Sequence, residues 1–120
     1  MSHIFQDELV TIKVQESEIP WLVIYLNSKT KELSQTTSEE KIRLFELLDT
    51  IEKEMLSFYA PTKINIASFG NMYPHMHFHI MARFEDDGFY PEPMWGARQR
   101  ESITTITDVS DFVSTLISRF

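Results

Sequence analysis

The spacing of apolar residues switches along this chain from a period of two to about 3.6, back to two, and again to about 3.6. This order favours an α+β domain, in which helices cover one face of an antiparallel sheet. The segments that carry the pattern are strands at 10–14 and 21–26, a helix between Thr37 and Pro61, strands at 64–67 and 75–84, and a helix over 109–120.

Both helices have recognisable starts. Thr37 followed by Glu40 forms a capping box, in which each side chain accepts a hydrogen bond from a free backbone N–H of the other residue. Thr107 or Asp108 can cap the second helix in the same way. The long helix carries an apolar stripe that predicts a core-facing side: Leu44, Phe45, Leu48, Ile51, Met55 and Phe58.

Size and charge exclude several classes of protein. The 120 residues suit one domain over 1–120, and a net charge of −7 disfavours binding to a nucleic acid polymer. The longest apolar run, Trp21–Leu26, is too short to cross a bilayer, and the first residues resemble no leader, so we expect a cytoplasmic protein with no membrane partner. Because the chain has no cysteine, any metal site would need histidine and carboxylate ligands.

The most informative segment is the alternating run from His75 to Met81, which reads His-Met-His-Phe-His-Ile-Met. In a strand, successive side chains point to opposite faces, so His75, His77 and His79 share one face while the apolar residues between them point into the core. Their imidazoles would repeat at about 6.6–6.8 Å along a row that faces water. Like charges at that spacing repel, so the row should titrate as a coupled unit in which some members stay neutral near pH 7.

The charge distribution around this row favours an anion. No Asp or Glu occurs from Ala60 through Phe84, although 18 acidic residues occur in the whole chain. Lys63 and Arg83 bracket this window and could offer local positive charge. Taken alone, Arg83 is more typical of a solvated strand end than of a ligand.

The motif His-φ-His-φ-His-φ-φ, where φ is apolar, is matched at every position from His75 to Met81. It resembles the signature of the histidine triad (HIT) family of nucleotide hydrolases and transferases. The segments 65–71 and 89–96, with Arg83 between them, resemble a bacterial branch often labelled diadenosine tetraphosphate hydrolase-like.

The resemblance implies a fold and an activity. The fold is a five-stranded antiparallel sheet with one long helix and a C-terminal helix, extended across a homodimer in which two sheets join. The wholly apolar run Trp21–Leu26 also suggests a dimer, because it is more than one small domain needs to bury. The activity is that of a nucleotide phosphoramidase or dinucleoside polyphosphate hydrolase, with a small nucleotide substrate and neither cofactor nor metal.

The resemblance also implies roles for individual residues. His77 attacks the α-phosphorus and forms a nucleotidyl-histidine that water hydrolyses, His79 holds the phosphate oxygens, and His75 orients or polarises the row. Asn65 and Asn71 become substrate-binding candidates, although asparagine is also typical of turns. Many relatives carry Gln followed by Ser or Thr before the triad, whereas this chain has Asn71 and Met72.

Two alternatives remain at this stage. Histidines two apart on a strand can share a metal ion with a nearby carboxylate such as Glu85 or Asp86, which would make the protein a metal-dependent enzyme. The departure at Met72 is also compatible with a nucleotide-binding module that does not turn over its ligand.

Overall fold

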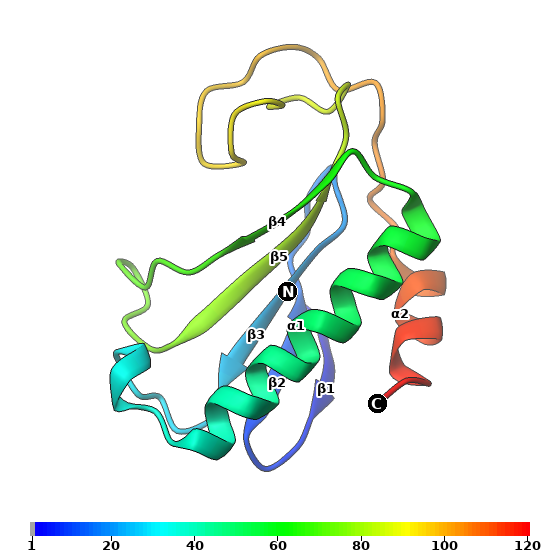
Figure 1. Ribbon diagram of the computed structural model, residues 1–120. Coiled ribbons are helices and arrows are strands. Elements are labelled where there is room, and N and C mark those ends of the chain that lie inside the picture. The colour runs from blue at the N-terminus through cyan, green and yellow to red at the C-terminus, as the bar shows by residue number, and fades with distance from the viewer. Residues whose placement is uncertain (1) are drawn as a thin grey trace.

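A computed structural model describes residues 2–120 and shows one five-stranded antiparallel sheet with helices packed on it (Figure 1). The strands lie in the order β1-β2-β3-β5-β4. The predicted α+β class and five-stranded antiparallel sheet are therefore confirmed. The elements are β1 (Ser2–Gln6), β2 (Val10–Val14), β3 (Trp21–Leu26), the short 3-10 helix η1 (Leu33–Gln35), α1 (Ser38–Tyr59), β4 (Lys63–Ala67), β5 (His77–Arg83) and α2 (Ser110–Ile117).

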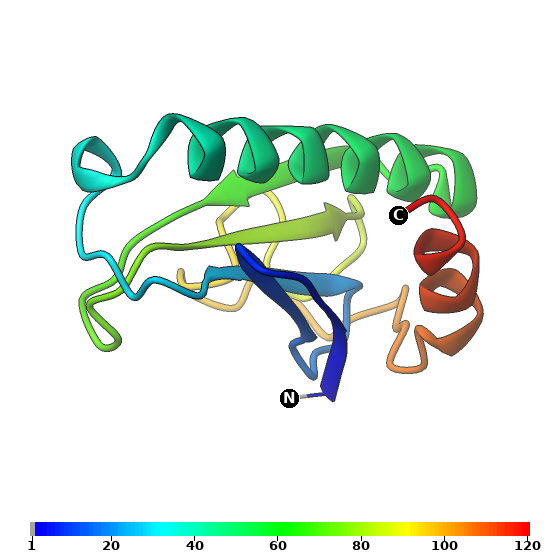
Figure 2. The same ribbon diagram turned by 90° about the horizontal axis from the view of Figure 1, so that it is seen from below.

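Helix α1 lies across one face of the sheet, and Figure 2 shows it as a separate layer above the strands. It starts as predicted, because Thr37 and Glu40 form the capping box, and it ends before Pro61 with Ala60 in the left-handed conformation. Among the described residues, neither helix combines the length and the apolar character that crossing a membrane requires.

The apolar stripe of α1 is partly as predicted. Leu44, Leu48, Ile51 and Met55 are buried, and so is Leu47, which the pattern did not include. Two predicted members are exposed instead, since Phe45 keeps 54% and Phe58 keeps 45% of its surface open. Both rings lie at the border of the buried face, where they lean on Phe78 and Phe112 respectively.

Helix α2 also forms where the spacing predicts it, with Phe112 and Leu116 in the core. Its N-cap is Val109, one residue after the predicted cap Asp108. The Asp108 carboxylate still accepts a hydrogen bond from the Ser110 N–H at 2.9 Å, so it stabilises the helix start from outside the cap position.

Strand β3 is the central strand of the sheet, between β2 and β5. Leu22, Ile24 and Leu26 face the core under α1, and Val23 on the other face is also fully buried. Within one subunit the apolar run Trp21–Leu26 is thus buried except for Trp21 and Tyr25, which are half-buried. It gives no reason to expect a dimer, contrary to the argument from sequence.

Candidate active site

The histidine row lies on the face of the sheet opposite α1. Ile80 and Ala82 of β5 belong to the core, with Met76 and Phe78 packed against it, so His77 and His79 point to the other side as the alternation predicts. The regular strand starts at His77 rather than at His75. Before that point the Met76 carbonyl still accepts from the Leu26 N–H of β3, while the Met76 N–H donates to the Thr30 carbonyl in the loop after β3.

His77 is held in one tautomer by the backbone. Its Nδ1 lies 2.7 Å from the carbonyl oxygen of His75, and because a carbonyl only accepts, Nδ1 carries the proton. In the neutral ring the lone pair then lies on Nε2. The Tyr25 ring stacks on the His77 imidazole at 5.2 Å with an interplanar angle of 24°, which fixes the orientation of the ring.

His79 has the opposite tautomer. Its Nδ1 accepts a hydrogen bond from the indole N–H of Trp21 at 3.0 Å, so this nitrogen has no proton and Nε2 carries one. Burial, together with the positive charge that His77 can carry, lowers the pKa of His79 to about 4. His79 is therefore neutral at pH 7, as expected for some members of the row, and its Nε2–H is a fixed donor.

The two rings are closer than strand geometry alone suggests. The His77 and His79 centroids are 5.2 Å apart and the rings are nearly perpendicular, at 75°. One ring thus offers a lone pair and its neighbour a proton within a short distance, which is the arrangement needed to attack a phosphorus atom while holding its oxygens.

His75 takes part mainly through its backbone. Its carbonyl orients His77, while its own Nδ1 donates to the Lys29 carbonyl at 2.7 Å and its ring contacts Tyr73 at 4.8 Å. The resemblance implied that His75 orients the row. In the structure its backbone carbonyl can do so by accepting the hydrogen bond from His77 Nδ1, whereas its imidazole points to the Lys29 carbonyl.

The row is less open to water than the sequence predicts. His77 retains only 8% of its surface, because Tyr25 and Tyr73 lie against it. Trp95, from the loop after β5, packs on His79 at 4.9 Å and on Trp21 at 5.1 Å. The sequence analysis missed Trp21 and Tyr25, although the register of β3 against β5 places them beside the row.

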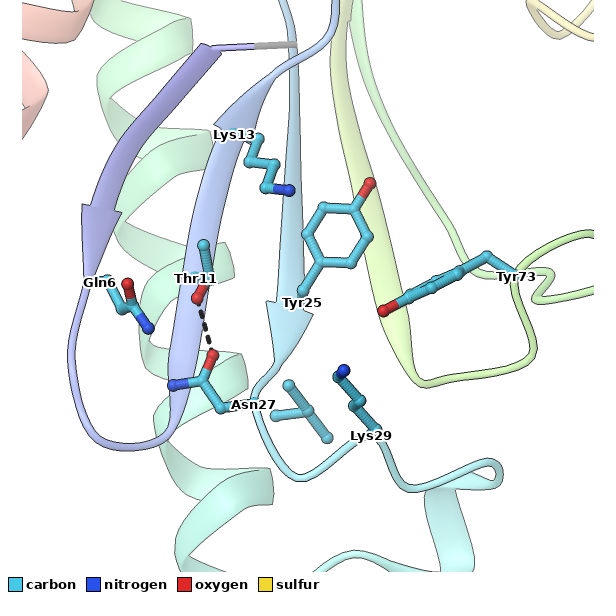
Figure 3. Close-up of a pocket in the computed structure, with 8 residues that line it drawn as sticks. Gln6, Thr11, Lys13, Tyr25, Asn27, Lys29 and Tyr73 are labelled. Atoms are coloured by element: carbon cyan, nitrogen blue, oxygen red, sulfur yellow. Dashed lines mark hydrogen bonds between the residues drawn. The ribbon is translucent and has the colours of Figure 1, made fainter.

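A cavity of about 670 Å³ is lined in part by Tyr25 and Tyr73, the two rings that contact His77. The rest of its lining comes from β1, β2, the end of β3 and the loop after β3 (Figure 3). The site therefore combines a pair of histidines in defined tautomers with a space large enough for part of a small molecule.

Residues 2–86 match the HIT domain family, and this stretch contains the whole histidine row. The chain belongs to the HIT domain family. A comparison with curated protein sequences gave no match.

Solved structures share this HIT fold over most of their length. A histidine triad protein from Marinobacter aquaeolei superimposes with a TM-score of 0.82 at 22% identity, over 98% of this chain and 88% of that one. A histidine triad protein from Bradyrhizobium japonicum gives a TM-score of 0.80 at 24% identity, over 97% of this chain and 87% of that one. A Plasmodium falciparum diadenosine triphosphate hydrolase gives a TM-score of 0.61 at 16% identity, over 96% of this chain and 71% of that one.

The two asparagine candidates lie in different surroundings in this HIT domain. Asn65 is on the histidine face of β4, opposite Met81, and its Oδ1 accepts a hydrogen bond from Arg83 Nη1 at 2.9 Å. Asn71 lies exposed in the turn between β4 and β5. The structure thus places Asn65 on the sheet face of the triad and Asn71 in the loop that precedes it.

The expectation that Arg83 is a solvated strand end is wrong. Arg83 is 2% exposed, and its guanidinium donates to both carboxylate oxygens of Asp87, to Asn65 and to the Glu92 carbonyl. Burial alone would raise the pKa of Asp87, but hydrogen bonds from Arg83 and from the amides of Phe89, Phe84 and Tyr90 lower it to about 2. Arg83 therefore anchors the loop after β5, and its charge is neutralised there.

The carboxylates suggested for a metal site are far from the histidines. Glu85 and Asp86 follow the far end of β5, six and seven residues beyond His79, which is about 20 Å along an extended chain. Within residues 2–120, no three His, Asp or Glu side chains are grouped closely enough to hold a metal ion.

Proposed function

We propose that this HIT protein is a nucleotide hydrolase or transferase that acts at the α-phosphate of nucleoside phosphoramidates or dinucleoside polyphosphates. The observation that carries the proposal is the pair of opposite tautomers. His77 presents a lone pair on Nε2, and neighbouring His79 presents a proton on Nε2.

The reaction follows from these two atoms. His77 Nε2 attacks the α-phosphorus and forms a P–N bond, while the bond from phosphorus to the leaving group breaks and its electron pair goes with that group. A polyphosphate leaves as an anion, whereas a leaving amine takes up a proton from solvent. The His79 Nε2–H donates to a non-bridging oxygen and stabilises the charge that develops there. A water molecule then attacks the phosphorus, releases the nucleoside monophosphate and restores His77.

The surroundings of the row are compatible with this sequence of steps. The His75 carbonyl accepts from His77 Nδ1–H, so it stabilises the positive charge that the His77 ring gains once Nε2 is bonded to phosphorus. Asn65 and Asn71 remain proposed substrate contacts, Asn65 by virtue of its place on the histidine face.

The comparisons agree with this class of activity. One structural neighbour is described as a diadenosine triphosphate hydrolase, and another, from Sulfolobus tokodaii, as a histidine triad nucleotide-binding protein. At identities of 16% and 10% they share the fold, and we carry their chemistry to this chain only as part of the proposal, together with the diadenosine tetraphosphate hydrolase-like branch.

A homodimer belongs to the same proposal. Strand β4 is an edge strand, because within residues 2–120 it pairs only with β5, and edge strands offer free backbone donors and acceptors to a second sheet. Exposed apolar side chains lie on or next to this edge, including Ile66 at 45% and Phe69 at 56%. We propose that two copies pair through β4.

The test is hydrolysis of adenosine 5′-phosphoramidate and diadenosine tetraphosphate by the His77→Asn variant. The Asn amide can still donate to the His75 carbonyl, so the fold should survive, but no nucleophilic ring nitrogen remains. We expect turnover to fall by about 10³-fold or more while nucleotide binding persists.

His3→Asn is the matched control, since His3 is exposed on β1 and should leave turnover unchanged. Full activity in His77→Asn would refute the assignment of the nucleophile. Tight nucleotide binding by the wild-type protein with no turnover of either substrate would instead identify a binding module.

A further inference from the structure

Trp95 reaches back over the sheet from the loop after β5. Its ring centroid lies 4.9 Å from that of His79, 5.1 Å from that of Trp21 and 4.7 Å from that of Phe69, and all three contacts are edge-to-face. Edge-to-face packing at such distances is a favourable arrangement of aromatic rings. Trp95 therefore touches both partners of the hydrogen bond that the Trp21 indole donates to His79 Nδ1.

The loop that carries Trp95 is tied to the sheet, although residues 84–97 form no helix or strand. Asp87 is fully buried, and its carboxylate accepts hydrogen bonds from Arg83 and from two amides of the loop. Arg83 also donates to the Glu92 carbonyl at 2.7 Å, three residues before Trp95. A buried ion pair at the end of β5 thus holds the loop close to the point where Trp95 begins.

A tight turn then sets the place of the Trp95 side chain. The Gly96 N–H donates to the Pro93 carbonyl at 2.8 Å. Met94 and Trp95 are the central residues of this turn. A Cβ on Gly96 would lie 3.1 Å from the Glu92 Cβ and 3.2 Å from the Pro93 carbonyl oxygen, closer than ordinary van der Waals contacts. The compact backbone of the loop therefore fixes where the Trp95 ring lies.

The contacts of Trp95 bear on the tautomer of His79. The Trp21 indole reaches His79 Nδ1 only in its present orientation, and both side chains are only half-buried. Trp95 packs against both rings and is itself 47% exposed, so it covers the pair on one side and faces water on the other. Without this cover, the Trp21 ring can turn and water can compete for Nδ1.

We propose that Trp95 is a positioning residue that holds the Trp21 indole on His79. The inference rests on the proposed function, in which the His79 Nε2–H stabilises charge that develops on a phosphate oxygen. Trp95 acts through Trp21 and needs no contact with the substrate. When its ring is removed, His79 can place its proton on Nδ1 instead, and a fraction of the molecules then lacks the Nε2 donor.

The experiment compares Trp95→Ala with Trp95→Phe, because phenylalanine retains a ring and alanine does not. The chain has two tryptophans, so the single indole N–H signal of either variant belongs to Trp21. NMR measures the exchange of this proton with water, and hydrolysis of diadenosine tetraphosphate measures kcat.

In Trp95→Ala we expect the Trp21 indole proton to exchange about ten-fold faster than in the wild-type protein, because the hydrogen bond opens more often. The kcat should fall by about three- to ten-fold, the range that lost aromatic contacts supply. Trp95→Phe should restore most of both values.

Phe58→Ala is the matched control. Phe58 is 45% exposed, close to the 47% of Trp95, and it lies on α1 at the other face of the sheet. The spectrum of Trp95→Phe identifies the Trp21 signal in this variant, which should keep the wild-type exchange rate and the wild-type kcat.

The outcomes separate this inference from the proposed function. Equal exchange of the Trp21 proton in Trp95→Ala and Trp95→Phe would overturn the inference. An equal loss of kcat in both variants would overturn it too, since the Trp95 indole would then act on the substrate directly. Absence of turnover in the wild-type protein would overturn the proposed function, whereas the exchange comparison needs no substrate and still decides whether Trp95 holds Trp21.

Discussion

At the scale of single residues, the site depends on which ring nitrogen of each histidine carries the proton. Trp21 decides this for His79, because its indole N–H occupies His79 Nδ1 and leaves the proton on Nε2. Trp21 thus acts through His79 as a positioning residue, with no need to touch the substrate.

The first prediction concerns that hydrogen bond. Trp21→Phe keeps an aromatic ring but removes the donor, so the His79 tautomer is no longer fixed and kcat should fall about ten-fold, which is the loss of one moderate hydrogen bond. Nitrogen-15 NMR of the imidazoles should show a mixture of His79 tautomers. Trp95→Phe is the control, since Trp95 also packs on His79 and its ring contacts are retained. An unchanged tautomer in Trp21→Phe would contradict this role.

The second prediction concerns pH. The pKa of His79 is about 4 in the folded protein and about 6.5 when unfolded, so between these values the unfolded chain binds more protons and stability rises with pH. This contribution is present above about pH 6.5 and is lost as pH falls toward 4. Because His79 is only half-buried, solvent screening reduces the total to on the order of 2 kcal/mol.

Urea unfolding at pH 7, 5.5 and 4 measures this loss. In His79→Gln the side chain no longer titrates, so the fall in unfolding free energy over this window should be smaller than in the wild-type protein. Equal pH dependence in the two proteins would show that His79 is not held neutral. The Asp87 contribution lies in a lower window, because its pKa of about 2 places its loss below pH 4.

The alternation of residue types predicted that His77 and His79 share one face of β5, but not which side chains contact them. The row itself could be recognised because alternation in a strand is a local property. The hydrogen bonds from Arg83 to Asn65 and from Trp21 to His79 join residues 18 and 58 positions apart, and no local pattern records such pairings. The sequence did not indicate Lys13 and Lys29 as cations near the histidines for the same reason. Lys63 and Arg83, which it did indicate, lie closer to the histidine row in sequence.

At the scale of elements, local patterns predicted most of the structure. The capping box of α1, the pairing of 10–14 with 21–26 and the hairpin of β4 with β5 follow from spacing and turn residues. Strand β1 has no such signal, because Ile4 and Phe5 are adjacent and the ladder shifts between His3 and Phe5. The family resemblance implied a fifth strand but gave neither its residues nor its place in the sheet.

The third prediction tests the start of α1, the helix that supports the rear face of β5. Thr37→Ala removes the acceptor of the Glu40 N–H and should lower the unfolding free energy by about 1 kcal/mol. Chemical denaturation measures the change. Thr105→Ala, an exposed loop position, is the control and should change stability by less than about 0.5 kcal/mol. Equal effects of the two substitutions would count against the capping box.

At the scale of the whole molecule, the proposed dimer joins two sheets through their β4 edges. The fourth prediction is that light scattering at micromolar concentration gives the mass of two chains. Ile66→Glu places a charge on this edge and should shift the protein toward monomer, whereas Ile103→Glu, at a loop position that is 78% exposed, should not. A monomeric wild-type protein would contradict the proposed pairing. The cytoplasmic location stays a prediction from sequence.

The whole molecule can be described as a sheet with a supporting face under α1 and a reacting face that carries the histidines (Figure 2). The reacting face has two parts: Trp21 and Trp95 pack around His79, and a cavity lined by Lys13 and Lys29 lies next to Tyr25, which stacks on His77. Net charge and composition could not predict this division, because it arises only when β2, β3 and the loops before and after β5 come together.

The most direct test of the account is to trap the intermediate. The protein is mixed with adenosine 5′-phosphoramidate or diadenosine tetraphosphate, quenched rapidly in alkali, digested and analysed by mass spectrometry. The account predicts one AMP joined to the peptide that contains His77, specifically on that ring, and none in His77→Asn. Wild-type turnover with no nucleotidyl-enzyme at any quench time, or with AMP on His75 or His79 instead, would contradict it.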